Sequence, residues 1–292
     1  MKKGRGGVFM KFHKKPAIHV GKVQLKVSNL KESTQFYTEI IGLSIKNQSE
    51  SEVSFTTNGK DTLLSIIEPK DVQVKREQTT GLYHIALLLP TRADLAQVVR
   101  HFIEKGIRFG SGDHLVSEAL YLSDLDGNGI EIYVDRNSNE WNWKNGEVAM
   151  TTDPVDFESL LKERSNGTWQ GLPKNTVMGH VHLQVNNLEE NEQFYVDGLG
   201  FSVVNRYGRA ALFISDYDYH HHIAFNVWAG QHIRHAEKHE TGLAAYTIVF
   251  PNEETRQEKI TSLKKIGRTV LEENGNYYTY DPSQTKIWFL VG

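Results

Sequence analysis

The alternation of apolar and polar residues predicts short strands, each followed by a helix. Residues 23–27 alternate in the way that a half-buried strand requires. Ser28 or Asn29 can then cap a helix whose apolar residues recur at helical spacing. These apolar residues are Leu30, Phe36, Tyr37, Ile40 and Ile41. Gly42 is expected to end the helix, and β-patterned runs follow at 53–57 and 63–67.

This pattern returns later in the chain. Residues 27–43 match residues 185–201 without a gap, including a Phe-Tyr pair and a closing glycine. A second match sets 81–82 and 90–106 beside 242–243 and 251–267. The chain is therefore a tandem duplication of 17–136 and 176–292. The connector between the halves, 137–175, carries Trp141, Trp143, Pro154 and Trp169.

Each half divides again into two similar units. In the second unit of the first half, a strand at 84–89 precedes a helix at 93–105, and strands follow at 121–122 and 130–134. The sequence thus predicts an α+β protein of four βαβββ modules. We place module one at 17–70, module two at 80–136, module three at 176–230 and module four at 240–292. Each module needs a partner to cover its sheet, so the modules should pair.

Composition narrows the classes of partner. The 292 residues carry a formal charge of −3, and the sequence pI of about 6.5 gives no basic field for nucleic acid or a membrane surface. We therefore expect a small-molecule partner, and self-association into a homo-oligomer is left open. Because cysteine is absent, disulfides and thiolate sites are excluded, whereas the 13 histidines keep a histidine and carboxylate metal site open.

The beginning of the chain is basic, with Lys2, Lys3 and Arg5. No apolar stretch long enough for a signal peptide or a membrane span follows. We therefore expect a cytoplasmic protein, without membrane association, that begins with a short loose tail.

Several motifs resemble those of one superfamily. One is the strand–helix plan of the four modules, with Phe-Tyr at 36–37 and again at 194–195, each pair followed by a closing glycine. The others are the segments Asp-Leu-Asp-Gly-Asn-Gly-Ile-Glu at 124–131 and Tyr-His-His-His-Ile-Ala-Phe-Asn at 219–226. Together they resemble the vicinal oxygen chelate superfamily of glyoxalases, bleomycin resistance proteins and extradiol dioxygenases. The chain is most similar to the two-domain catechol 2,3-dioxygenases. The resemblance implies two half-barrel domains, 17–136 and 176–292, of two modules each.

In that superfamily, metal ligands come from the first and last strands of the modules. Here the first strands offer Gln24, His84, His182 and Ala245. The last strands offer an apolar run near Leu64 in module one and Glu131 in module two. They offer the run His220-His221-His222 in module three and Trp288 in module four. The resemblance implies a triad of His84, His182 and Glu131. Two imidazoles and one carboxylate suit non-haem Fe(II), and Mn(II) or another divalent metal suits the same ligands.

The resemblance also implies three further active-site residues. Extradiol dioxygenases of this superfamily carry an acid–base histidine in a His-His-Ser-Leu/Ile-Ala-like strand. Aligned on Ile223-Ala224, the residue of this chain at that place is His221. His114 and Tyr121 would hydrogen-bond a substrate hydroxyl. The implied reaction is ring cleavage of catechol or a small substituted catechol by dioxygen, as in the catabolism of aromatic hydrocarbons.

Plainer interpretations apply to other residues. Glu131 follows a turn signal, and that turn is a poor match to a calcium loop. Strand alternation would put His220 and His222 on the face opposite His221, at the surface or an interface. In polar stretches, five histidines are expected to be solvated: His13, His19, His232, His235 and His239. Four aromatic residues could line a substrate pocket or pack in the core: Tyr83, Phe225, Trp228 and Tyr246.

Two other functions fit the same scaffold. A glyoxalase-type lyase or isomerase could use Gln24, His84 and Glu131 if module one paired with module two. A metal-free protein that binds drugs or other small molecules would leave His84, Glu131 and His182 scattered. The sequence alone does not exclude either function.

The pairing of the modules decides whether one complete site forms. If each half closed on itself, both sites would be incomplete. Pairing module two with module three gathers His84, Glu131, His182 and His221, and leaves modules one and four without a ligand set. The connector is long enough to allow this pairing. We therefore predict one metal per chain, with the side-chain nitrogens of His84 and His182 close enough to share one ion at ligand distances of about 2.1 Å.

Overall fold

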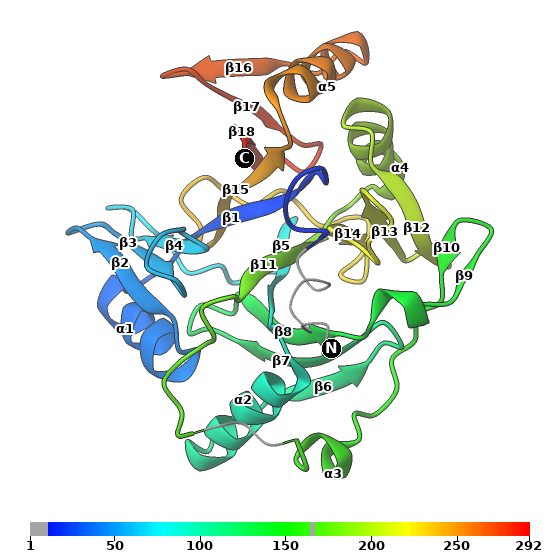
Figure 1. Cartoon of the computed structure of the whole chain (residues 1–292). Helices are drawn as coiled ribbons and strands as arrows, with labels where there is room; N and C mark the ends of the chain where they lie inside the picture. The colour runs from blue at the N-terminus through cyan, green and yellow to red at the C-terminus, as the bar shows by residue number, and fades with distance from the viewer. Residues whose placement is uncertain (1–10, 164–166) are drawn as a thin grey trace.

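The computed structural model describes residues 11–163 and 167–292, which form two eight-stranded mixed sheets and a two-stranded hairpin (Figure 1). Helices pack on the outer sides of the sheets. The predicted α+β class and the four βαβββ modules are confirmed.

One sheet, here called the site sheet, is built from modules two and three in the order β12-β13-β14-β11-β5-β8-β7-β6. Its strands from module two are β5 (Gly81–Leu88), β6 (Gly110–Asp113), β7 (Ser117–Ser123) and β8 (Gly129–Asp135). Those from module three are β11 (Val177–Gln184), β12 (Ser202–Tyr207), β13 (Ala211–Ser215) and β14 (Ile223–Asn226). The antiparallel pair β5 and β11 joins the two modules at the centre.

The other sheet, here called the companion sheet, is built from modules one and four in the order β16-β17-β18-β15-β1-β4-β3-β2. Module one supplies β1 (His19–Lys26), β2 (Ser44–Gln48), β3 (Glu52–Thr56) and β4 (Leu64–Ile67). Module four supplies β15 (Gly242–Phe250), β16 (Val270–Glu273), β17 (Asn276–Tyr280) and β18 (Lys286–Val291). The predicted pairing of module two with module three is therefore confirmed, and each sheet takes one module from each half of the sequence.

The helices follow the first strand of each module. They are α1 (Leu30–Gln35) continued by η1 (Phe36–Ile40), α2 (Arg92–Glu104), α4 (Leu188–Glu192) continued by η3 (Gln193–Gly198), and α5 (Glu253–Lys265). Asn29 caps α1, because its side chain accepts a hydrogen bond from the backbone N–H of Glu32. Gly42, with φ of +86°, ends this helical segment as predicted. The segments η1 and η3 are π-helical, which the sequence did not predict.

The tyrosine of each Phe-Tyr pair bonds a carboxylate in the following module. The hydroxyl of Tyr37 donates to Asp124 over 2.8 Å, and that of Tyr195 donates to Asp281 over 2.9 Å. Asp124 precedes β8 and Asp281 precedes β18, so each bond fixes the turn that leads into a last strand. The repeat thus encodes a contact between modules as well as a helix.

The connector wraps from β8 to β11 and is ordered over its described residues. It contains η2 (Ser138–Glu140), the hairpin of β9 (Trp143–Lys144) and β10 (Glu147–Val148), and α3 (Phe157–Leu160). Trp141 packs in a small cluster with Phe12 and Tyr219. The prediction of a loose tail is wrong at Phe12 and His13, which are both buried. Lys2, Lys3 and Arg5 lie outside the described residues.

The prediction that five histidines are solvated is correct for only some of them. His232 and His239 are exposed, and His19 and His235 are half-buried. His13 is 7% exposed and bonds the carbonyl of Gly179 over 2.9 Å, so its prediction is wrong. Sequence polarity around residue 13 does not show that this segment packs against module three.

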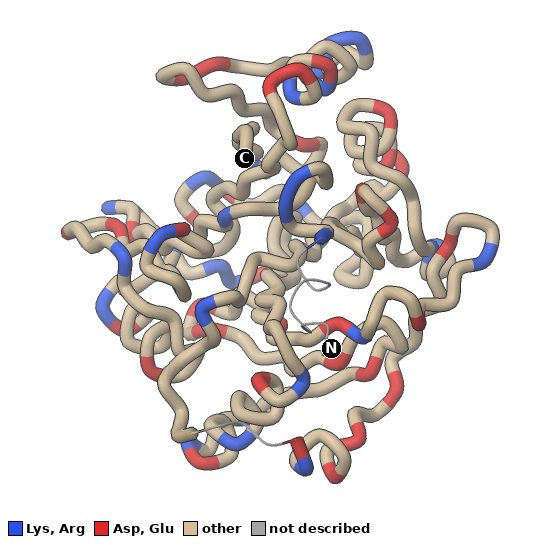
Figure 2. The backbone as a smooth tube through the Cα atoms, viewed as in Figure 1, with Lys and Arg blue, Asp and Glu red and all other residues tan. Residues whose placement is uncertain are grey.

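Charged residues of both signs are interspersed along the chain (Figure 2). None of the described helices is long and apolar enough to cross a membrane.

Candidate metal centre

Three strands of the site sheet bring His84, Glu131 and His180 together. Ala86 on the central strand β5 pairs with His180 on one side and with Glu131 on the other. His84 lies two residues before Ala86 and therefore points to the same face. The methyl group of Ala86 leaves room above the sheet, into which the three longer side chains converge.

The distances between the three donor atoms suit a single metal ion. Nε2 of His84 lies 3.0 Å from Oε2 of Glu131, Nε2 of His180 lies 3.2 Å from the same oxygen, and the two nitrogens are 3.3 Å apart. Ligands at about 2.1 Å from one ion are about 3.0 Å apart at octahedral angles and about 3.4 Å apart at tetrahedral angles. An ion bound to these three donor atoms would keep the coordination positions opposite them open for other ligands.

Burial and mutual contact set the protonation states of this cluster. Burial lowers the pKa of His180 to about 4, although the neighbouring carboxylate opposes the change, so this imidazole is neutral at neutral pH. Burial would raise the pKa of Glu131, but the bonds and charges of His180 and His84 outweigh it and hold that pKa well below its usual range. A carboxylate beside neutral imidazole is the ligand form that divalent metals bind.

His182, the histidine that the sequence predicted as a ligand, lies beside this cluster. Its ring centroid is 4.9 Å from that of His84, its pairing partner across the strands. However, its Nε2 accepts a hydrogen bond from the side-chain amide of Asn226 at 3.0 Å, which occupies the nitrogen lone pair. The three donors that converge include His180 in its place. The sequence held a signal for His180, because residues two apart on a strand share a face.

His221, which is expected from the sequence to be the acid–base residue, lies against the cluster. Its ring centroid is 4.0 Å from that of His180 and 5.1 Å from that of Phe213. Burial lowers the pKa of His221 well below its ordinary value, so the ring is neutral.

The two other histidines of the run do not share a face, and both are fully buried, so the prediction of surface positions is wrong. His220 bonds Asp135, whereas His222 bonds the carbonyl of Phe12. Strand alternation fails here because the run precedes β14, which begins at Ile223.

His114 and Tyr121 are joined to each other next to the cluster. Nδ1 of His114 donates to the carbonyl of Thr151 in the connector over 2.6 Å, so its Nε2 accepts from the hydroxyl of Tyr121, also over 2.6 Å. Tyr121 pairs with Glu131 across β7 and β8. Burial and the Glu131 carboxylate raise the pKa of Tyr121 well above its ordinary value, which keeps the phenol protonated.

Aromatic rings line one side of the cluster. The ring of Tyr83 lies 4.9 Å from that of His182 and 5.1 Å from that of Trp228. Tyr83 and Trp228 are 43% and 48% exposed, so a ligand could reach them. Phe225 and Tyr246, in contrast, are fully buried core residues and do not line a pocket.

The companion sheet has no equivalent ligand set among its described residues. By strand register, Lys22, Ala245 and Trp288 stand where the site sheet has His180, His84 and Glu131. Gln24 also lies in the companion sheet, and its amide donates to Glu52. Gln24 therefore does not join His84 and Glu131, as the glyoxalase-type ligand set would require. The convergence of His84 and Glu131 likewise contradicts the scattering expected of a metal-free binder.

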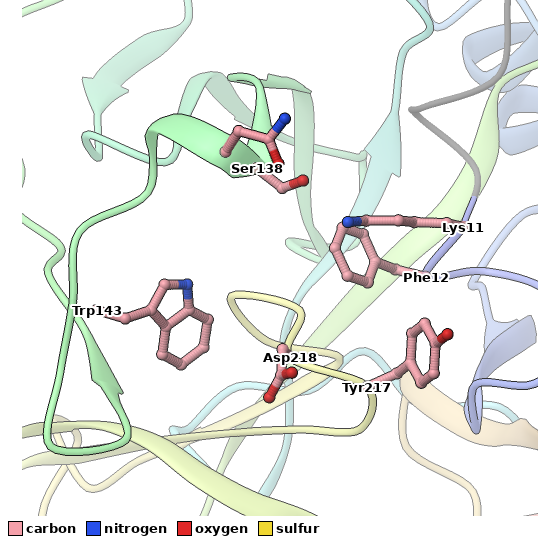
Figure 3. A pocket seen from close by; sticks show the side chains of 7 residues that line it. Lys11, Phe12, Ser138, Trp143, Tyr217 and Asp218 are labelled. Carbon is pink, nitrogen blue, oxygen red and sulfur yellow. The ribbon is translucent and has the colours of Figure 1, made fainter.

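A cavity of about 390 Å³ lies apart from the candidate metal centre (Figure 3). Its walls come from the connector, the N-terminal segment and the loop after β13, and they are formed by Lys11, Phe12, Ser138, Asn139, Trp143, Tyr217 and Asp218. None of these residues belongs to the metal cluster.

The fold, with its repeated modules and a histidine and carboxylate cluster on one sheet, defines a class of protein. The chain belongs to the Glyoxalase/Bleomycin resistance protein/Dioxygenase superfamily, whose family model matches residues 19–132 and 177–289. The resemblance seen in the Phe-Tyr repeat is thereby confirmed.

One curated relative is similar over almost the whole chain. The catechol-2,3-dioxygenase of Bacillus subtilis (strain 168) is 41% identical over 277 residues, which cover 94% of this chain and 97% of the relative.

Solved structures agree on the fold. A Bacillus subtilis subsp. subtilis str. 168 protein crystallised as a proposed dioxygenase aligns with a TM-score of 0.66 and 14% identity, over 95% of this chain and 86% of that chain. Glyoxalase I from Zea mays aligns with a TM-score of 0.55 and 13% identity, over 94% of this chain and 92% of that chain. Since two different names occur on one scaffold, the fold alone does not define the reaction.

Proposed function

We propose that this chain is an Fe(II)-dependent extradiol dioxygenase that opens the ring of catechol or a small substituted catechol. The observation that carries the proposal is the convergence of His84, Glu131 and His180 on one face of the site sheet. The likeness to the catechol-2,3-dioxygenase of Bacillus subtilis supports it over nearly the full length of both chains.

His84, His180 and Glu131 would hold the metal through Nε2, Nε2 and Oε2. When bound, Fe(II) would supply open coordination positions for the diol and for dioxygen, and a path for electron density between them. The sequence predicted His182 in place of His180. We now assign His182 to the wall of the site, because its Nε2 already accepts from Asn226.

His221 and Tyr121 supply the proton chemistry in this proposal. His221 is neutral and lies against His180, so it can accept the proton of a diol hydroxyl that binds above the cluster. Tyr121 stays protonated and is held by His114, so its hydroxyl keeps a fixed direction near Glu131. Tyr121 lies on β7 of module two and His221 precedes β14 of module three, so the two residues would approach the substrate from different sides.

The aromatic residues beside the cluster favour a planar aromatic substrate. Tyr83, Trp228 and His182 form a wall of mutually contacting rings. Phe213 continues this wall, since it contacts both His182 and His221. Edge and face contacts with these rings would orient an aromatic ring above the metal ligands.

The test is aerobic turnover by protein loaded anaerobically with Fe(II). We expect catechol to cause oxygen consumption together with a yellow ring-opened product, and we expect about one iron per chain by elemental analysis. Mn(II)-loaded protein in parallel establishes which metal supports turnover. Protein that holds iron and consumes no oxygen with catechol or methylcatechols would overturn the proposal.

A pair of variants separates loss of the site from loss of the fold. Glu131→Gln should remove both metal and turnover, because it takes away the anionic donor. Glu118→Gln is the matched control, since Glu118 is a buried glutamate on the neighbouring strand β7 that bonds Arg92 outside the cluster. Full iron content and full activity in Glu131→Gln would contradict the assigned ligands.

A further inference from the structure

Two buried residues form a hydrogen-bonded chain behind His221. Asp135 ends β8, four residues after Glu131. Its Oδ1 lies 2.9 Å from Nε2 of His220, and Nδ1 of His220 lies 2.8 Å from Nδ1 of His221. Asp135 and His221 are each 8% exposed, and His220 is fully buried, so these bonds do not compete with solvent.

The order of the bonds determines where the protons lie. A carboxylate only accepts, so Nε2 of His220 carries a proton and donates it to Asp135. In a neutral His220, Nδ1 then has no proton and accepts from Nδ1–H of His221. His221 is left with a free lone pair on Nε2, the ring nitrogen that takes no part in this chain.

Two tyrosines hold the aspartate in place. The hydroxyl of Tyr219 donates to Oδ1 of Asp135 at 3.3 Å, and the hydroxyl of Tyr133 lies 2.7 Å from that of Tyr219. Tyr133 in turn packs on Gly179, where an added Cβ would be only 1.9 Å from the tyrosine oxygen. Gly179 directly precedes His180, so the strand with the metal ligand also supports this chain of bonds.

We propose that Asp135 and His220 are positioning residues that hold His221 as its Nδ1–H tautomer and present its Nε2 to the substrate. The role in catalysis rests on the proposed function, whereas the tautomer does not. In the reaction, the proton of a diol hydroxyl moves to Nε2 of His221, and the O–H electron pair stays on the diol oxygen. The resulting imidazolium donates through Nδ1–H to Nδ1 of His220, whose Nε2–H continues to donate to the Asp135 carboxylate. The chain thereby stabilises the charge that forms on His221.

The tautomer can be observed without turnover. We suggest ¹H–¹⁵N long-range correlation spectra of the metal-free protein at a fixed neutral pH, with the His221 signals assigned by their loss in His221→Gln. The expected wild-type pattern is Nδ1–H on His221. In Asp135→Leu and in His220→Phe we expect a shift toward the Nε2–H form. An Nε2–H pattern in the wild type, or an unchanged pattern in both variants, would overturn the proposal.

Kinetics supply the second measurement. In iron-loaded protein, His220→Phe should keep its metal and its KM for catechol while kcat falls by roughly 10²–10⁴, the range for a lost acid–base contribution. Asp281→Asn is the control for general damage, because Asp281 is a buried aspartate between β17 and β18 of the companion sheet that bonds Tyr195 in η3, outside the hydrogen-bonded chain of His221. An unchanged kcat in His220→Phe would reject the positioning role. If no protein turns over catechol, the proposed function fails, while the spectra still decide the tautomer.

Discussion

At the scale of single residues, His180 and His182 offer a direct test of the metal centre. We predict that His180→Ala lowers the metal content from one per chain to near zero, because it removes a donor atom 3.2 Å from Glu131. His182→Ala should keep the metal, since Nε2 of His182 accepts from Asn226 and is not directed to the ion. Elemental analysis of both variants checks this pair, and the reverse result would restore the ligand set predicted from the sequence.

Two of the three residues of the candidate site could be predicted from the sequence, and the difference at the third has a physical cause. Repeats and motifs place His84 and Glu131 at module positions, and the structure brings both into the cluster. His182 was preferred to His180 because it aligns with the first-strand positions of the other modules. Which of two histidines on one strand face donates to an ion depends on side-chain partners, here the amide of Asn226. Sequence spacing contains no information about that partner.

His13 gives a prediction about acid stability. Burial lowers the pKa of His13 to about 3, so the folded chain does not protonate it until well below the ordinary value of 6.5. The unfolded chain binds this proton below pH 6.5, so the stability from a neutral His13 is present above pH 6.5 and is lost as the pH falls toward 3. In metal-free protein, His13→Gln should make the free energy of unfolding less steep between pH 6 and 4, by up to about 1.4 kcal/mol per pH unit.

Urea titrations at several pH values measure that slope. His232→Gln is the control, because His232 is exposed and should leave the slope unchanged. An equal slope in His13→Gln and the wild type would show that His13 is not buried in its neutral form.

At the scale of elements, the tyrosine of each Phe-Tyr pair should contribute similarly in both halves. Tyr37→Phe leaves the buried carboxylate of Asp124 without one donor, and Tyr195→Phe does the same to Asp281. We expect each substitution to lower the free energy of unfolding by about 1–3 kcal/mol. Phe36→Tyr, at a half-buried neighbour, should have a much smaller effect. A loss below about 0.5 kcal/mol in both Tyr variants would show that these bonds do not secure the turns.

Periodicity predicted most elements but not their local irregularities. The strands and helices that alternation and helical spacing predict in modules one and two lie within a few residues of the observed elements. The π-helical segments were missed because their extra residue changes hydrogen bonding without removing the apolar stripe, as in the bond from the Ile41 N–H to the Phe36 carbonyl. Strand β2 was missed because all five of its residues are exposed, so it has no apolar face to detect.

At the scale of the whole molecule, the central strand pairs join the two halves of the sequence. β5 pairs with β11 and β1 pairs with β15, so each sheet spans both halves. The candidate metal centre also takes His84 and Glu131 from the first half and His180 from the second. Repeats in the sequence reveal the modules but not their partners. The incompleteness of either half as a metal site was the signal that indicated the cross-pairing.

This arrangement predicts the behaviour of a chain that is cut in the connector. Gly167 and Thr168 are exposed, so a protease site can be inserted between them while Gly167, with φ of +123°, stays a glycine. The nicked protein should elute as one particle of unchanged size and keep about one metal per chain, because the fragments share both central strand pairs and a continuous core. The two fragments expressed separately should each lack the metal, since neither holds all three donors. Size-exclusion chromatography with metal analysis measures both outcomes. Fragments that separate after nicking, or a single fragment that binds the metal at full stoichiometry, would contradict a site built from both halves.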